Sequence, residues 1–132
     1  MLKIKRLAAA MPAQDVKRAR QFYEQKLGLK PFQERPDGGA LYVVGETGFL
    51  VFQSAGKASG NHTQMAVDVD DVVEAVGELK RAGVKLEEYD LPGFKTQDGM
   101  IDMPDGGKGA FFKDTEGNLI GLGTMVPAAT RS

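Results

Sequence analysis

The sequence carries one pattern twice, and this internal repeat constrains the fold more than any other feature. A shift of 56 positions places Asp15–Val16 on Asp71–Val72, each at the start of a segment whose apolar residues recur at helical spacing. The letters Pro-Asp-Gly-Gly, typical of a turn, occur at 36–39 and again at 104–107. Because both matches fall at the same place in each copy, we expect two modules of similar structure.

The first copy predicts a strand, a helix and three further strands. Asp15 is a suitable N-cap, apolar residues follow at three- and four-residue spacing from Val16, and Gly28 ends the helix. Turn-forming residues separate the segments that follow it. The predicted strands are 1–12, 29–33, 40–44 and 49–53.

The second copy repeats this order after a small, polar, glycine-rich linker. Asp70 or Asp71 caps a helix that ends at Gly83. The predicted strands are 64–69, 84–89, 110–113 and 119–123. The expected organisation is a single domain, with module one at 1–53, the linker at 54–61, module two at 62–126 and a tail at 127–132. The fold class is α+β, with two tandem βαβββ modules.

A curved four-stranded sheet with one helix leaves its concave face uncovered. We therefore expect the two modules to form a curved mixed sheet around a cavity, with the helices outside. A small-molecule site is expected in that cavity.

Composition excludes several classes of function. The chain has 42% hydrophobic and 27% charged residues and a formal net charge of −1, so neither a nucleic acid nor a membrane partner is expected. It contains no cysteine, which excludes disulfides and thiolate chemistry. The N-terminal apolar run is interrupted by Pro12 and is too short for a signal peptide core or a membrane span. Cytoplasm is the expected location.

Three segments of the sequence resemble those of the vicinal-oxygen-chelate superfamily, which includes glyoxalases, bleomycin resistance proteins and extradiol dioxygenases. AAAMPAQDVKRARQFYEQKLGL (8–29) and MAVDVDDVVEAVGELKRAGV (65–84) look like the openings of its two modules. GAFFKDTEGNLIGL (109–122) resembles its closing hairpin. The resemblance implies paired βαβββ modules and a cavity.

Enzymes of this family bind one divalent metal through four side chains, usually His and Glu. Carried over residue by residue, the four positions are Ala8, the apolar segment Leu50–Phe52, Gln64 and Gly121. Alanine, leucine and glycine side chains cannot coordinate a metal, and a single neutral amide oxygen binds it weakly. The resemblance therefore implies the cavity but no metal and no cofactor.

His62, the only histidine, is the one candidate for acid–base catalysis. It lies two residues before Gln64, so both side chains could face the cavity. The alternative is a solvated histidine at the end of the linker, which we favour because no acid is evidently placed to orient the imidazole. Asp98, Asp102 and Asp105 lack the spacing of a calcium-binding loop and are interpreted as solvated carboxylates.

The segment Leu91–Met103 is longer than a hairpin requires and has no counterpart in the first copy. It is interpreted either as a lid or pocket wall, or as a kinked edge strand. Aromatic side chains on the strands could stack on a planar ligand or fill the core, and alternation places only one of Phe111 and Phe112 on the concave face. The predicted ligand-binding residues are Gln64, Tyr42, Phe52, Phe94, Met100 and Phe111.

The function these features predict is binding of a hydrophobic or aromatic small molecule in the cavity without metal, by a homodimer. The alternative is an enzyme, either a divergent glyoxalase-type lyase or isomerase, or a dioxygenase. A regulatory module with a filled cavity is the third possibility.

Overall fold

The protein, described by a computed structural model over residues 1–103 and 106–124, divides into two compact units. Unit 1 contains residues 1–59 together with the turn 114–118, and unit 2 contains 60–113 and the segment that begins at Leu119. The boundary between the two units therefore falls between Ser59 and Gly60, within the predicted linker at 54–61. Nothing in the sequence indicated that residues 114–118 belong to unit 1. The predicted tail at 127–132 lies outside the described residues.

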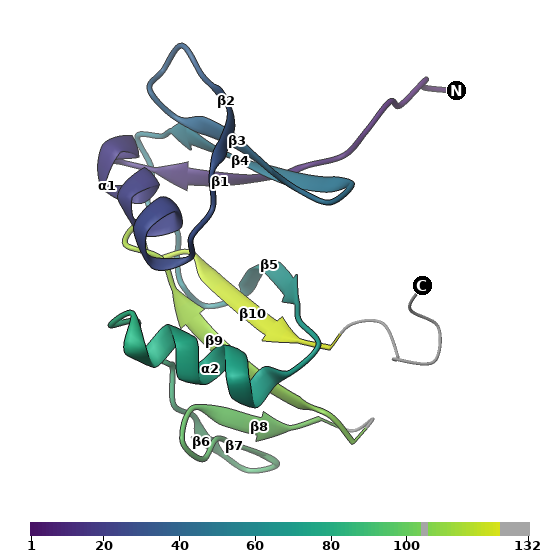
Figure 1. The fold of residues 1–132 in the computed structure, drawn as a ribbon, viewed down its shortest axis with the longest axis vertical. Helices are drawn as coiled ribbons and strands as arrows, with labels where there is room; N and C mark the ends of the chain where they lie inside the picture. The colour runs from purple at the N-terminus through teal and green to yellow at the C-terminus, as the bar shows by residue number, and fades with distance from the viewer. Residues whose placement is uncertain (104–105, 125–132) are drawn as a thin grey trace. The chain divides into compact units, whose positions relative to one another are not determined.

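Unit 1 forms one four-stranded mixed sheet with a single helical segment (Figure 1). The strand order is β1-β4-β3-β2, in which β1 is parallel to β4 and the other neighbours are antiparallel. The elements are β1 (Ala9–Ala13), α1 (Val16–Gln21), its π-helical continuation η1 (Phe22–Lys26), β2 (Pro31–Glu34), β3 (Ala40–Val44) and β4 (Thr47–Gln53).

The helical segment of unit 1 begins and ends as the sequence predicts. An oxygen of the Asp15 side chain accepts a hydrogen bond from the backbone N–H of Arg18 at 3.0 Å. Gly28 lies just beyond the last turn with a φ of 74°, a conformation that glycine adopts without strain.

Four aromatic rings form the core of unit 1 together with Met11 and Val51. Phe22, Tyr23, Tyr42 and Phe49 are all buried, and the ring centroids of Tyr23, Tyr42 and Phe49 lie 5.1–5.9 Å apart. We call these four residues the core ring cluster.

The first strand is shorter than the predicted 1–12. Residues before Ala9 belong to no strand, and the apolar side chains of Leu2, Ile4 and Leu7 are exposed. Pairing of β1 with β4 begins only at Ala9 and Phe49, although β4 itself begins at Thr47.

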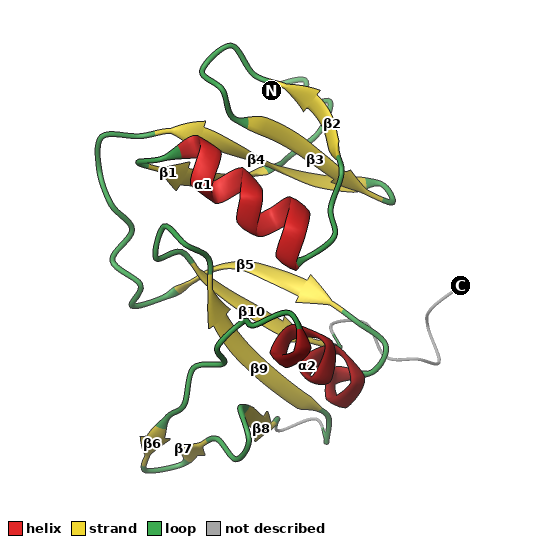
Figure 2. Cartoon of the chain, turned by 60° about the vertical axis from the view of Figure 1, so that its left-hand side comes forward, coloured by secondary structure: helices red, strands yellow, loops and turns green. Residues whose placement is uncertain are grey.

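Unit 2 has the same topology, which confirms the internal repeat (Figure 2). The strand order is β5-β10-β9-β8, with β5 parallel to β10 and the other neighbours antiparallel. A separate two-stranded sheet pairs β6 with β7. The elements are β5 (Thr63–Asp68), α2 (Val72–Arg81), β6 (Asp90–Leu91), β7 (Phe94–Lys95), β8 (Met100–Asp102), β9 (Lys108–Lys113) and β10 (Leu119–Gly123).

The second helix is also capped and buried as predicted. Asp71, rather than Asp70, is the N-cap, and its side chain accepts from the backbone N–H of Glu74. The predicted apolar face, formed by Val72, Val76 and Leu79, is buried. No helix in the described residues is long and apolar enough to span a membrane.

The predicted strand 84–89 is wrong. This segment forms only an isolated bridge between Leu86 and Phe112, and the sheet position next to β9 is taken by β8. Alternating burial of Val84 and Leu86 produced a strand pattern in a segment that meets β9 only through this bridge and a hydrogen bond from the Glu87 N–H to the Phe111 carbonyl at 2.7 Å. The insertion predicted at Leu91–Met103 contains most of the hairpin β6–β7, which begins at Asp90, and β8, the true second strand of the module.

Candidate functional site

The candidate site is built on one face of the unit 2 sheet. On β9, Ala110 and Phe112 are almost fully buried, and alternation directs Phe111 to the opposite face. Gly121 on β10 pairs directly with Phe111 and therefore shares its face. We call this the Phe111 face.

Three half-buried aromatic rings meet on the Phe111 face. The ring centroid of Phe111 lies 5.8 Å from that of Tyr89, edge to face, and 6.0 Å from that of Phe94. Tyr89 and Phe94 contact each other at 5.4 Å. We call these three residues the open ring cluster. Each is intermediate in exposure, so the rings keep accessible surface on which a planar molecule can stack.

The insertion supplies two of these three rings. Tyr89 directly precedes β6 and Phe94 begins β7, so the hairpin carries them together to β9. The Thr96 hydroxyl fixes this hairpin by accepting from the backbone N–H of Tyr89 at 2.8 Å and donating to the Glu88 carboxylate at 3.0 Å.

Gly121 lies next to Phe111 of the open ring cluster. A Cβ at this position would stand 3.2 Å from the Thr63 methyl group and 3.4 Å from the nearest Phe111 ring atom. The absence of a side chain at position 121 is what lets the Phe111 ring lean over β10.

The four positions that correspond to metal ligands in the family do not fit a metal. Ala8 is exposed ahead of β1, Leu50 is apolar, and Gly121 has no side chain and is crowded by Phe111. Gln64 is the single potential donor. No group of three or more His, Asp or Glu side chains suited to a metal occurs in 1–103 and 106–124. Apart from Gln64, these side chains offer no atom that could bind a metal.

Gln64 lies in a β-bulge. Leu119 pairs with Thr63 and Ile120 with Met65, which leaves Gln64 as the extra residue of β5. Its Oε1 atom is buried and accepts no hydrogen bond from the described residues. The bulge also explains why Thr63, and not Gln64, contacts the space above Gly121.

Two ion pairs lie near the open ring cluster. Lys113 Nζ lies 3.7 Å from a Glu87 carboxylate oxygen, and Lys95 Nζ lies 3.6 Å from Asp90. Burial raises the pKa of the Tyr89 phenol, and the negative charge of Glu87 raises it further. The tyrosine is therefore a neutral hydroxyl at physiological pH.

The structure places the predicted ligand-binding residues in different environments. It brings Phe94 and Phe111 together, whereas Met100 pairs with Ala110 and so lies on the opposite face of the sheet. There it lines a polar hollow of about 220 Å³ with Lys95, Gln97, Asp98, Asp102 and Lys108. The assignment of Met100 to the same pocket wall as Phe94 is corrected accordingly.

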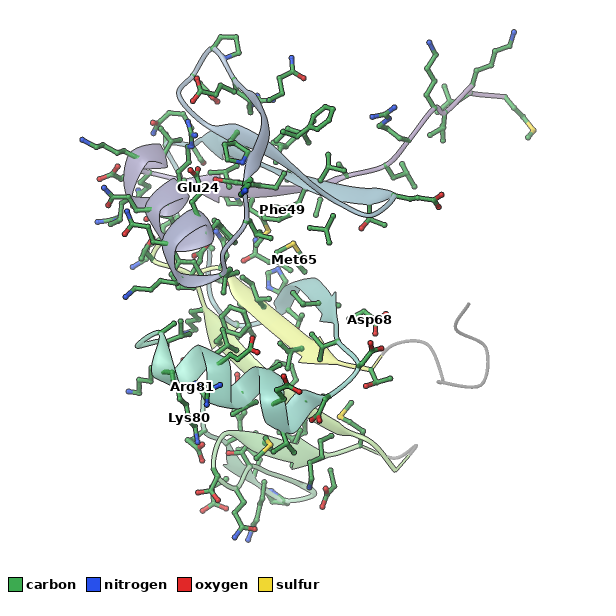
Figure 3. The ribbon with its side chains drawn as sticks, viewed as in Figure 1. Glu24, Phe49, Met65, Asp68, Lys80 and Arg81 are labelled. Atoms are coloured by element: carbon green, nitrogen blue, oxygen red, sulfur yellow. The ribbon has the colours of Figure 1, made fainter. Side chains whose placement is uncertain are left out.

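Tyr42 is a core residue. It is fully buried in the core ring cluster, and its hydroxyl donates to a Glu24 oxygen at 2.8 Å. Figure 3 labels Glu24 on the helical segment and Phe49 on β4, two residues that Tyr42 contacts. Its prediction as a ligand contact is corrected, because the alternation of β3 points it into the core. Phe52, by alternation with buried Val51, lies on the other face of β4 and is half-buried.

His62 is exposed in the bend that precedes β5. Asp102 forms an ion pair with Lys108 at 2.8 Å, and Asp105 lies outside the described residues. A catalytic role for His62 remains a prediction.

Sequence reasoning missed Tyr89 and Thr63. An aromatic residue five positions before Phe94, at the entry to the insertion, was the available signal for Tyr89. Thr63 had no signal, because its position depends on the bulge at Gln64.

Unit 1 contains a buried polar network on the turn 114–118. The Asp114 carboxylate accepts from the Tyr23 hydroxyl at 2.6 Å, from the Asn118 side-chain amide at 2.8 Å, and from the backbone N–H groups of Glu116 and Asn118. The Asn118 amide also donates to the Pro12 carbonyl. These four hydrogen bonds satisfy the buried Asp114 carboxylate.

Glu116 in the same turn pairs with Arg18. The guanidinium donates to both carboxylate oxygens, at 2.7 and 3.1 Å. Burial opposes ionisation of Glu116, but the bonds from Arg18, the Asp15 backbone and Thr115 outweigh it and hold its pKa below the usual value.

Comparison with known proteins gives one family. A model of the Glyoxalase/Bleomycin resistance protein/Dioxygenase superfamily matches residues 3–122. No curated protein matches the chain.

Among solved structures, lactoylglutathione lyase from Agrobacterium tumefaciens has 18% sequence identity to this chain. The match covers 92% of this chain and 95% of the lyase, with a TM-score of 0.69. The bleomycin resistance determinant encoded on transposon Tn5 has 19% sequence identity to this chain. That match covers 92% of this chain and 98% of the determinant, also with a TM-score of 0.69. TnmS3, an antibiotic binding protein from Streptomyces sp. CB03234, has 20% sequence identity to this chain. Its match covers 94% of this chain and 98% of TnmS3, with a TM-score of 0.67. At these identities the likeness shows the fold.

Proposed function

Because the chain belongs to the glyoxalase/bleomycin resistance protein/dioxygenase superfamily, we propose that it binds an aromatic small molecule without a metal, on the open ring cluster of unit 2. The observation that carries this proposal is the meeting of three half-buried rings from β9 and the inserted hairpin. Such rings can stack on a planar ligand, at about 0.5–1.5 kcal/mol for each ring pair in addition to the area buried.

The composition of the Phe111 face supports a binding role. Gly121 stands where a family enzyme would place a metal ligand, and the Phe111 ring overlies it. The antibiotic binding protein TnmS3 and the Tn5 bleomycin resistance determinant share this fold. Their described roles are consistent with the same use of the fold here.

Equilibrium dialysis with naphthalene, in buffer that contains a metal chelator, tests this proposal. We expect saturable binding at one site per chain that is weakened at least about tenfold by Phe111→Ala, since the substitution removes the central ring. Phe32→Ala is the matched control, because Phe32 is 67% exposed on β2 in unit 1. Equal binding by all three proteins would contradict the assignment of the site.

A divergent lyase, isomerase or dioxygenase is the second candidate. The buried, unpartnered Oε1 of Gln64 is the observation that favours it, because this oxygen could ligate a cation or orient a substrate. Elemental analysis of protein purified without chelator distinguishes the two candidates. A stoichiometric divalent metal would favour the enzyme, and its absence would favour the binding protein.

We also propose that the protein is a cytoplasmic homodimer. A chain without cysteine is compatible with a reducing compartment, and the family to which the chain belongs supports the dimer. Sedimentation equilibrium checks the oligomeric state, and a monomer at micromolar concentration would contradict it.

A further inference from the structure

We infer that the hydroxyl groups of Thr63 and Tyr89 determine specificity on the Phe111 face, selecting a neutral bicyclic aromatic molecule that carries polar oxygens at both ends. This inference rests on the proposed aromatic site and adds the substrate class to it.

Thr63 reaches the site because of the bulge at Gln64. Its methyl group lies 3.2 Å from the position that a Cβ of Gly121 would occupy, and the Phe111 ring lies 3.4 Å from the same point. Thr63 and Phe111 therefore border the same small space above β10, from opposite sides. Thr63 is exposed, so its hydroxyl is accessible to a bound molecule.

Tyr89 brings a second hydroxyl-bearing side chain into contact with Phe111. Its ring packs edge to face against Phe111 at 5.8 Å, which leaves Phe111 between the two hydroxyl-bearing residues. Within 1–103 and 106–124, neither the Thr63 hydroxyl nor the Tyr89 hydroxyl forms a hydrogen bond with another residue. Each can both donate to and accept from a ligand oxygen.

The charge of this face favours a neutral ligand. Glu87 and Lys113 compensate each other at 3.7 Å, and the Tyr89 phenol is un-ionised. A charged ligand would have to compete with that ion pair, whereas a phenol or quinone oxygen needs only the two hydroxyls.

The experiment compares two probes on three proteins by equilibrium dialysis in chelator. Naphthalene presents the rings alone, and 2,6-dihydroxynaphthalene adds one hydroxyl at each end. The proteins are the parent chain, Thr63→Val and Tyr89→Phe, substitutions that preserve the shape of the side chain and remove only its hydroxyl.

We expect each substitution to lower the ratio of diol affinity to naphthalene affinity by about threefold to tenfold, the size of one net hydrogen bond. Naphthalene affinity is measured for each protein as its own reference, so that any effect of the substitution on stacking cancels in the ratio. Circular dichroism confirms that the variants are folded.

The outcomes separate this inference from the function on which it rests. An unchanged ratio in both variants, with both probes still bound, would overturn the role of the hydroxyls and leave the aromatic site intact. If the parent binds neither probe, the aromatic site and the inference both fail. A fall in the ratio in only one variant would assign specificity to that hydroxyl and reject the other.

Discussion

The two units share one strand order but use their aromatic residues differently. In unit 1 the core ring cluster is buried, and its polar atoms are bonded to Asp114 and Glu24. In unit 2 the open ring cluster is half-buried, and the Tyr89 hydroxyl has no partner in the described part of the chain. The same strand order thus accompanies one set of buried rings and one set of half-buried rings that we propose as the binding site.

The inserted hairpin β6–β7 accounts for much of this difference. Unit 1 passes from its helical segment into β2 with a short connection, Leu27–Lys30. Unit 2 places 18 residues, 82–99, between α2 and β8, and these residues supply Tyr89 and Phe94. Long connections tolerate insertion at modest entropic cost, which makes them suitable places for a site on an existing fold.

Deletion of one ring from each cluster should give the largest contrast. Phe49→Ala removes a buried ring and should lower the free energy of unfolding by about 3–5 kcal/mol. Phe94→Ala removes a half-buried ring and should cost about 1–2 kcal/mol. Urea denaturation measures both. Similar costs would show that the open ring cluster is also a structural core.

The polar network around Asp114 should contribute to the stability of unit 1 and not to ligand binding in unit 2. Asp114→Ala removes the acceptor for four hydrogen bonds and should cost about 3 kcal/mol, because buried donors lose their partner. Tyr23→Phe, which removes one of these bonds, should cost about 1–1.5 kcal/mol. Naphthalene affinity should change little in the folded Tyr23→Phe variant, and a tenfold loss would contradict the separation of roles.

Glu116 should make the stability of the protein depend on acid pH. Its folded pKa lies below the unfolded value, so its contribution is complete above the unfolded pKa, near 4.5, and is lost as pH falls through the folded pKa. Glu116→Gln should therefore cost about 2 kcal/mol at pH 7. The difference between parent and variant should shrink below about pH 4, as the parent carboxylate takes up a proton. A constant difference between pH 7 and pH 3 would contradict this assignment.

Gly121→Ala should give the smallest of these effects. The added methyl group would press on Thr63 and Phe111 at 3.2–3.4 Å, which should cost about 1 kcal/mol and weaken naphthalene binding a few-fold. Gly56→Ala is the matched control, since its nearest atom beyond its chain neighbours lies 3.9 Å away. Equal behaviour of the two variants would mean that position 121 does not shape the ligand surface.

Local signals in the sequence were sufficient for the repeat and for both helices. Asp15 and Asp71 act as N-caps, because their carboxylates accept from N–H groups of the first turn. Gly28 and Gly83 follow the helices with positive φ, which glycine adopts without strain because it has no Cβ. The strand Leu119–Gly123 has the predicted bounds. These features depend on neighbours within a few residues, so a single sequence contains them.

Features set by distant partners could not be predicted in the same way. The bond from Tyr23 to Asp114 joins residues 91 positions apart, and the sheet register that separates Met100 from Phe111 depends on which segment pairs with β9. Alternation identified Phe111 as one of two possible inward residues but could not choose between Phe111 and Phe112. The bulge at Gln64, which brings Thr63 to the site, has no local sequence signature.

The most direct test of a metal-free aromatic site in unit 2 is to follow the aromatic NMR resonances of the protein while naphthalene is added in the presence of chelator. We expect the Tyr89, Phe94 and Phe111 signals to shift with one saturating curve, while those of Tyr23 and Tyr42 stay in place. Shifts confined to the core ring cluster, or shifts that appear only when a divalent metal replaces the chelator, would contradict a metal-free aromatic site in unit 2.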